Sequence, residues 1–429
     1  MERLTRDNFF PQISYALLMA AMVSVPWTRF LMLPIAVLMV VLFIVDSRYK
    51  FRFQTIRENK LLLPFFITLS VFLLSIIGTI YSDNVAKAVS DWECKLWFLA
   101  APLCILSLCG EITSQRVRIL LAAFVMSVTA TGIGNFVISA VSYANTGELS
   151  QFFYMNATHF FGEKATHPSY LSLYSEIAWV IAYILLIYNR ACFQKSTRIL
   201  LVSSLFILPI TIFLLQSKAG LLLFAVVILC TLIHTICKRI LPLWVGIVVL
   251  VGGIGLCTGI IASGELPENR LTDMRQQLRA DERSNPYNGT LQRLAVWQTS
   301  CEVAHDNLPF GTGTGDITDE LCRQYEAKGY TYILEKRLNC HNQYLQHFVG
   351  LGIPGLLALL LFIGYPIVEA IRKKDFLIGV WAVVVAGNLL VESMLETRAG
   401  SNFIPLMTLL LLLYQRIRQS EEFQLPNSR

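Results

Sequence analysis

The stretch HNQYLQHFVGLGIPGLLALLLFIGYPIVEA, residues 341–370, places a histidine and two amides directly before a long apolar run. The run is longer than the roughly 20 residues that an α-helix needs to cross a bilayer. The stretch therefore predicts a membrane-spanning helix over 343–370 with His341 at its boundary. A histidine there can act as a base, bind a ligand or stabilise the structure, and the rest of the chain has to distinguish these roles.

Similar apolar runs recur along almost the whole sequence. Of the 429 residues, 55% are hydrophobic and only 15% are charged, against about 25% charged residues in soluble domains. We expect an all-α integral membrane protein with about twelve transmembrane helices. The predicted spans are 13–25, 27–45, 61–80, 96–109, 117–142, 168–189, 198–215, 219–236, 241–262, 343–370, 376–391 and 401–415.

Lysine and arginine gather in every second loop, at 48–60, 116–118, 190–198, 238–239 and 372–374. The positive-inside rule makes these loops and both termini cytoplasmic. The polar segment from about 264 to 339 then lies on the opposite, periplasmic side. The chain divides accordingly into spans one to nine (1–262), a periplasmic loop region with short helices (263–340) and spans ten to twelve (341–429).

The net charge of +6 needs no nucleic-acid partner, because the basic loops face anionic membrane lipid. No CxxC pair or His/Cys cluster has the spacing of a zinc site. Cys301, Cys322 and Cys340 lie in the periplasmic segment, where one disulfide can form and one thiol would remain.

Five basic residues from separate parts of the chain fall at the predicted periplasmic surface of the membrane. Lys218, in QSKAGLL (216–222), is fixed at the membrane surface by a very short turn. It is either a snorkelling lysine or a cation that faces an anionic substrate. Arg293 and Trp297 are four residues apart in a predicted amphipathic helix, LQRLAVWQTSC (291–301), and share one face. An interfacial anchor would show the same pattern.

The other three lie near the starts or ends of spans. Asn339 is a candidate N-cap that places His341 in the first helical turn, with Tyr344 on the same face. The positive helix N-terminus favours a neutral imidazole, which can accept a proton, although a structural histidine is the alternative. His167 precedes Pro168, which by itself explains a helix start. ESMLETRAGSN (392–402) brings Glu392, Glu396 and Arg398 to another short periplasmic turn. Several cations around one candidate base suit a substrate with an anionic leaving group.

The chain resembles the bacterial O-antigen ligase superfamily, which includes O-antigen polymerases and protein O-oligosaccharyltransferases. The resemblance rests on the spans, the long loop before the tenth, RLAVW and PFGTGTGD (309–316) within that loop, and HNQYLQHFVGLGIPG (341–355). It implies an inner-membrane glycosyltransferase that needs no cofactor or metal. The enzyme would transfer a glycan from undecaprenyl diphosphate to a hydroxyl, such as one of lipid A core, on the periplasmic face.

The same resemblance implies roles for the residues. His341 matches the essential histidine and would remove the proton of the acceptor hydroxyl as it attacks with inversion. Arg293 matches an arginine that binds the diphosphate. Lys218 stands where the family usually has arginine, which keeps the charge but loses the two-pronged geometry. Arg398, His167, Trp297 and Tyr344 are expected to line the substrate cavity.

Other functions have to be weighed against a ligase. A polymerase or oligosaccharyltransferase would use the same chemistry on another acceptor, and the large loop before His341 favours a ligase. A polysaccharide transporter would carry charged residues near the middle of its spans. Here only Glu176 comes close to such a position, and the other polar groups gather at one surface.

Overall fold

The computed structural model describes residues 6–27, 29–46, 48–154, 158, 167–240 and 289–424, and these residues form helices without strands. The α-helices are α1 (Arg6–Ser24), α2 (Arg29–Val45), α3 (Tyr49–Glu58), α4 (Leu62–Ile80), α5 (Val85–Cys94), α6 (Trp97–Cys104), α7 (Ser114–Thr146), α8 (Pro168–Tyr188), α9 (Lys195–Leu215), α10 (Lys218–Cys237), α13 (Gly289–Asp306), α14 (Ile317–Ala327), α15 (Thr331–Glu335), α16 (Gln343–Lys373), α17 (Phe376–Val391) and α18 (Arg398–Gln424). Short 3-10 turns η1 (Leu106–Leu108), η2 (Leu149–Phe152), η4 (Arg190–Cys192) and η5 (Met394–Glu396) lie between them.

Six of the described helices, α4, α7, α8, α9, α10 and α16, are long and apolar enough to cross a membrane, and α1 and α17 contain shorter apolar stretches. This agrees with the predicted membrane protein. The twelve-span topology stays a prediction, and its ninth span, 241–262, lies outside the described residues. The predicted span 96–109 is helical only over α6, where Pro102 lies inside the helix, and continues as a 3-10 turn.

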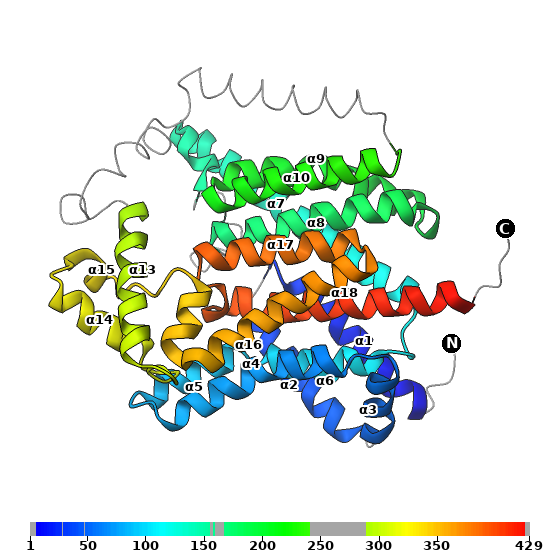
Figure 1. Ribbon diagram of the computed structural model, residues 1–429. Helices are drawn as coiled ribbons and strands as arrows, with labels where there is room; N and C mark the ends of the chain where they lie inside the picture. The colour runs from blue at the N-terminus through cyan, green and yellow to red at the C-terminus, as the bar shows by residue number, and fades with distance from the viewer. Residues whose placement is uncertain are drawn as a thin grey trace.

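The long helices run alongside one another, and α13, α14 and α15 lie at one end of the bundle (Figure 1). We call this end of the molecule the loop end. The helix α13 runs across the direction of α8, α9 and α10 in this view (Figure 1). The helices α8, α10 and α18 begin at the loop end, whereas α17 finishes there.

The helix α8 forms the centre of the bundle, and 83% of its apolar window is buried inside the protein. It packs on α7, α9, α10 and α17. The Tyr174 hydroxyl donates to the Ala399 carbonyl at 2.8 Å, which joins α8 to the start of α18. The ring of Phe403 packs edge-on against Tyr174 and stacks on Phe124 of α7. These contacts place the first residues of α8 and α18 side by side at the loop end.

The helix α16 is broken near its start at Gly352, which has φ +60° and ψ −148°. A broken helix leaves backbone groups without partners, and buried groups of this kind must find others. Residues 309–313 supply them. Thr312 N–H donates to the Val349 carbonyl at 2.9 Å, Gly313 N–H to the Gly350 carbonyl at 2.9 Å, and Ile353 N–H to the Pro309 carbonyl at 2.9 Å.

Glycines allow this close approach. Cβ atoms on Gly311 or Gly352 would lie 2.6 Å or less from backbone atoms of the opposite segment, and both residues have positive φ. The hydroxyl of Thr314 donates to the Ser75 carbonyl of α4 at 2.7 Å. The segment PFGTGTGD (309–316) therefore joins α13 and α14 to α4 and α16.

The three cysteines of the 289–340 segment carry free thiols. Cys301 is exposed, whereas Cys322 and Cys340 are buried. The disulfide that the sequence allows is not formed in this structure.

Candidate active site

His341 lies immediately before α16 and not in its first turn, so the capping prediction from sequence is wrong. The N-cap is Asn342, whose side-chain oxygen accepts hydrogen bonds from Tyr344 N–H at 2.9 Å and Leu345 N–H at 3.2 Å. Asn339 instead accepts from the His341 N–H at 3.0 Å. His341 has φ +43°, a left-handed conformation that is unfavourable for a residue with a Cβ. The surrounding contacts therefore hold this residue in a specific orientation.

A carboxylate binds the imidazole on one side. Nδ1 of His341 lies 3.0 Å from Oε1 of Glu392, the residue directly after α17. The other oxygen of Glu392 lies 3.7 Å from the Arg293 guanidinium on α13. Burial alone would raise the pKa of Glu392, but the hydrogen bond from His341 and the nearby positive charges lower it below its usual value. Glu392 is therefore ionised at neutral pH, and its Oε1 accepts a hydrogen bond from Nδ1–H of His341.

The tautomer follows from this contact. When Nδ1 carries the proton, Nε2 has a lone pair and can accept one. Nε2 of His341 makes no hydrogen bond to any residue in the described part of the chain. The ring is partly exposed, with 24% of the side-chain surface accessible. A substrate hydroxyl can therefore reach this nitrogen.

Arg293 and Trp297 share a face of α13, as predicted, and both face His341. The indole N–H of Trp297 donates to the His341 carbonyl at 3.4 Å, while Arg293 reaches Glu392. Trp297 therefore fixes the backbone of the histidine, and Arg293 adds positive charge beside it. The side chain of Arg293 is 41% exposed, so it can also contact a bound anion.

His167 belongs to the same cluster. It precedes α8, and its ring packs edge-on against Tyr170. Desolvation lowers the pKa of His167; the Glu392 carboxylate acts in the opposite direction, and the positive charge of Arg293 lowers it further. The ring is therefore neutral at pH 7 and offers hydrogen bonds rather than charge.

The remaining predicted residues lie at the loop end but contact other groups. Lys218 is exposed at the first position of α10, and Gly220 lies against Ser172 of α8, where a Cβ would be 2.0 Å from the Ser172 hydroxyl. The Tyr344 hydroxyl donates to the Ala386 carbonyl of α17 at 3.1 Å, so this residue holds α16 against α17. Arg398 interacts with the thiol of Cys94 at the end of α5.

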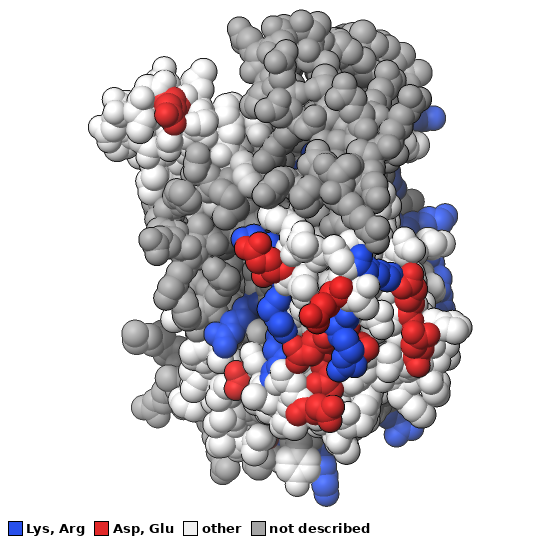
Figure 2. Space-filling model, turned by 90° about the vertical axis from the view of Figure 1, so that its left-hand side faces the viewer, with Lys and Arg blue, Asp and Glu red and all other residues white. Residues whose placement is uncertain are grey.

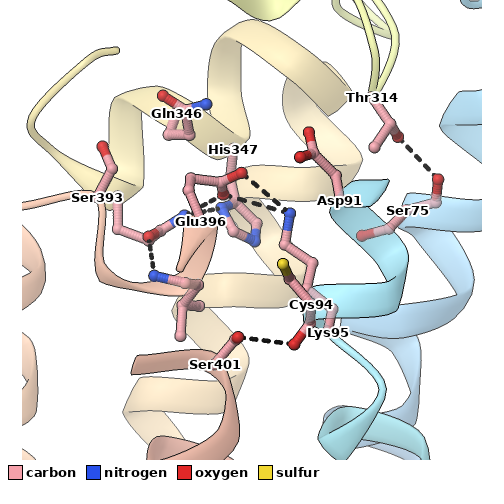
Figure 3. A network of polar contacts seen from close by, with 12 residues as sticks. Ser75, Asp91, Cys94, Lys95, Thr314, Gln346, His347, Ser393, Glu396 and Ser401 are labelled. Carbon is pink, nitrogen blue, oxygen red and sulfur yellow. Dashed lines mark hydrogen bonds and ion pairs between the residues drawn. The ribbon is translucent and has the colours of Figure 1, made fainter. Parts of the chain in front are cut away.

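A buried ion pair of Lys95 and Glu396 lies beside His347, another histidine of α16 (Figure 3). Lys95, which follows α5, contacts Oε1 of Glu396 at 3.2 Å, and their side chains are only 5% and 10% exposed. Burial favours neutral forms, but each partner stabilises the other's charge, so the pKa of Lys95 is raised and that of Glu396 is lowered. Gln343 donates to Glu396 at 2.9 Å and to His347 Nδ1 at 3.0 Å.

The segment from Glu392 to Glu396 runs along the start of α16. His341 contacts Glu392, the Asn342 N–H donates to the Ser393 hydroxyl at 3.1 Å, and the Gln343 side chain accepts from the Leu395 N–H at 2.6 Å. Three successive residues, His341 to Gln343, therefore bind residues of the segment from Glu392 to Glu396. Sequence reasoning placed Glu392 at a span boundary but did not assign it to the site, because no local pattern shows that two segments 51 residues apart are paired.

Within the described residues, no group of three or more His, Cys, Asp or Glu side chains is arranged to hold a metal ion. The cluster instead provides a nitrogen base, a carboxylate that orients it and a cation that binds anions. This arrangement suits proton removal from a hydroxyl next to an anionic leaving group.

Comparison with known proteins points in the same direction. Residues 203–360 match the model of a protein family described as O-antigen ligase. The matched segment includes α10, α13 and His341, and it confirms the resemblance to the O-antigen ligase superfamily that the sequence motifs indicated. No curated protein matches the chain.

Proposed function

From this family match and the geometry around His341, we propose that the protein is an O-antigen ligase of the bacterial inner membrane. It transfers a glycan from undecaprenyl diphosphate to a hydroxyl of lipid A core on the periplasmic side. The observation that carries this proposal is the arrangement of His341, Glu392 and Arg293, in which an oriented imidazole with an open Nε2 lies beside a partly exposed guanidinium.

The chemistry follows from the residues. The acceptor hydroxyl loses its proton to Nε2 of His341 while its oxygen attacks the anomeric carbon. The bond from that carbon to the diphosphate breaks on the opposite face, so the configuration inverts. The electron pair leaves with the diphosphate, and Arg293 stabilises the charge that develops there. Lys218 adds a second positive charge at the same end of the bundle.

This mechanism requires no acid to protonate the departing diphosphate, because diphosphate is a good leaving group as an anion. Glycosidases, in contrast, need a second carboxylic acid. In our proposal Glu392 is the orienting group for the base. The cations also supply the charge stabilisation that a metal provides in other phosphate chemistry, so transfer should persist in EDTA.

The same site would serve a polymerase or a protein O-oligosaccharyltransferase, because these enzymes differ in the acceptor. A purified transfer assay should therefore offer lipid A core, a serine-containing peptide and a second carrier-linked glycan as rival acceptors. We expect glycan on lipid A core alone. Transfer to the peptide or to the carrier-linked glycan would replace the ligase assignment with one of the alternatives.

The base assignment has its own test in the same assay. A general base contributes about 10²- to 10⁴-fold to the rate, so His341→Ala should lose at least this much while the protein still inserts and elutes as the wild type does. Near-normal transfer by His341→Ala would remove His341 from the mechanism.

A further inference from the structure

A cavity of about 340 Å³ opens beside His341, in the size range of about 300–1,000 Å³ typical of small-molecule sites. It lies between α5, α14 and the segment before α16. Its lining includes Asp91, Thr318, Asn339, His341, Gln346 and Glu396. Arg293, Glu392, His167 and Lys218 do not line it. His341 therefore borders this cavity and also contacts Glu392 of the cluster that contains Arg293.

The lining combines hydrogen-bonding groups with charges of both signs, because Lys87, Lys336 and Arg337 line the cavity together with Asp91 and Glu396. Gln346 is only 4% exposed, and its Oε1 accepts from the Cys340 N–H at 3.2 Å. Within the described residues, its Nε2 has no hydrogen-bond partner. The Nε2 atom is not fully enclosed, so it can donate a hydrogen bond to a group bound in the cavity.

The two carboxylates that line the cavity are already neutralised. Asp91 binds the Lys87 ammonium at 2.6 Å, and Glu396 binds Lys95. Figure 3 shows Asp91 and Glu396 on either side of the Lys95 ammonium, with Gln346 on the helix above. Paired carboxylates still have oxygens that accept hydrogen bonds. The cavity thus combines amide and cationic donors with carboxylate acceptors, and sugar hydroxyls, which both donate and accept, can bind to such a set.

We propose that this cavity is the acceptor site, where the terminal saccharide of the acceptor binds with its reacting hydroxyl at Nε2 of His341. The inference rests on the proposed function and adds to it the residues that select the acceptor. The anomeric carbon of the donor then lies next to the acceptor oxygen at Nε2, and its diphosphate is directed away from that oxygen, toward Arg293. Inversion requires this in-line arrangement, with the acceptor oxygen and the diphosphate on opposite faces of the anomeric carbon.

The test changes the volume of the cavity without touching the donor side. Thr318 lies at the start of α14 and lines the cavity, so Thr318→Trp should fill it. Glu326→Trp places the same side chain on an exposed position of the same helix and is the matched control. With the purified full-length protein, Thr318→Trp should raise the KM for lipid A core at least about tenfold, a loss of about 1.4 kcal/mol of binding. The KM for the undecaprenyl diphosphate-linked glycan should stay at the wild-type value.

A second, smaller substitution in the cavity keeps the proposal testable if Thr318→Trp does not fold. Gln346→Glu keeps the oxygen that binds the Cys340 N–H but removes the amide donor, so it should also raise the acceptor KM alone. Binding can be measured without turnover by saturation-transfer NMR of delipidated core oligosaccharide on His341→Ala protein. The saturation-transfer signal should disappear in the double variant that carries His341→Ala and Thr318→Trp. It should persist in the double variant that carries His341→Ala and Glu326→Trp.

Two outcomes would overturn the inference: an acceptor KM in both variants equal to that of Glu326→Trp, or a rise in the donor KM instead. Either result can be obtained with a wild-type enzyme that transfers glycan to lipid A core, so it would leave the proposed function intact. Failure of the wild type to use lipid A core would instead contradict the proposed function itself.

Discussion

At the scale of single residues, the site depends on one contact between two segments distant in sequence. Glu392 orients His341 through Nδ1 and carries a second contact to Arg293. Because the carboxylate is 15% exposed, its hydrogen bond is only partly screened by solvent. When His341 takes up the acceptor proton it becomes a positively charged imidazolium. The Glu392 carboxylate stabilises this imidazolium more strongly than it stabilises the neutral ring.

Glu392→Gln should therefore lower kcat more than it changes either KM. A hydrogen bond to a charged group contributes about 1.5–3 kcal/mol, which corresponds to about a 10- to 100-fold loss of rate. The measurement is initial-rate kinetics of the purified protein with both substrates varied. Glu326→Gln, which removes an exposed charge from α14, should transfer at the wild-type rate. A wild-type kcat in Glu392→Gln would show that the carboxylate has no part in orienting the base.

The same residue predicts how stability depends on pH. The pKa of Glu392 in the folded protein lies below its ordinary value of 4.5. Its ionised form therefore stabilises the protein above pH 4.5, and this contribution is lost as the pH falls through the folded pKa. Glu392→Gln should melt at a lower temperature than the wild type at pH 7, and the two melting temperatures should converge in acid. Tryptophan fluorescence during heating reports both melting temperatures. A difference between them that widens as the pH falls would contradict a stabilising role for ionised Glu392.

At the scale of elements, the break in α16 decides where His341 lies. The short first part of α16 is held by the glycine loop of residues 309–313, and its N-terminal residues pair with the segment from Glu392 to Glu396. The loop, the broken helix and the turn before α18 thus form one unit. The histidine is positioned by backbone contacts around it, since its own helix begins only at Gln343.

Two glycines of α16 test this role of the break. A Cβ on Gly352 would lie 2.0 Å from the Pro309 carbonyl, whereas a Cβ on Gly364 would meet no atom within 4 Å. Gly352→Ala should destabilise the protein by more than the about 1–3 kcal/mol of backbone strain alone, and it should lower transfer by displacing His341. Gly364→Ala should be neutral, or stabilising by up to about 1 kcal/mol, as expected for a helix interior. Denaturation in detergent would give the free energy of unfolding of both variants. Equal changes in that free energy would show that the break at Gly352 does not contribute to stability.

Much of this architecture follows from local sequence, because apolar runs that cross a bilayer are continuous in the chain. Three predicted spans match helices of the structure to within one residue at either end: 168–189 matches α8, 219–236 matches α10 and 376–391 matches α17. Arg293 and Trp297 could be placed together because helical periodicity is also local. The contact between Glu392 and His341, the broken α16 and the ion pair of Lys95 with Glu396 depend on how distant segments pack, which no local pattern records.

At the scale of the whole molecule, polar networks occupy the two ends of an apolar bundle. At the loop end, acidic and basic side chains mingle over the surface (Figure 2). At the other end, arginines pair with acidic residues that flank the long helices, Arg52 with Asp46, Arg416 with Glu369 and Arg418 with Asp375. Each end therefore has a partnered set of charges, and the topology rule assigns the end with the arginine-rich loops to the cytoplasm.

Three exposed cysteines can test that assignment in the living membrane. Cys301 lies on α13 at the loop end, whereas Cys192 and Cys237 lie where α8 and α10 finish, at the opposite end. In single-cysteine variants, a membrane-impermeant maleimide added to intact spheroplasts should label Cys301. It should reach Cys192 and Cys237 only after the membrane is opened.

The reverse pattern would have a direct chemical consequence. The cavity beside His341 and the cationic cluster would then face the cytoplasm, where the base could not meet an acceptor presented on the periplasmic side. Because His341 and Cys301 lie on the same loop end, one labelling experiment decides the side of the membrane for the whole proposed site. Labelling of Cys301 from outside would leave the acceptor as the remaining property for the transfer assay to determine.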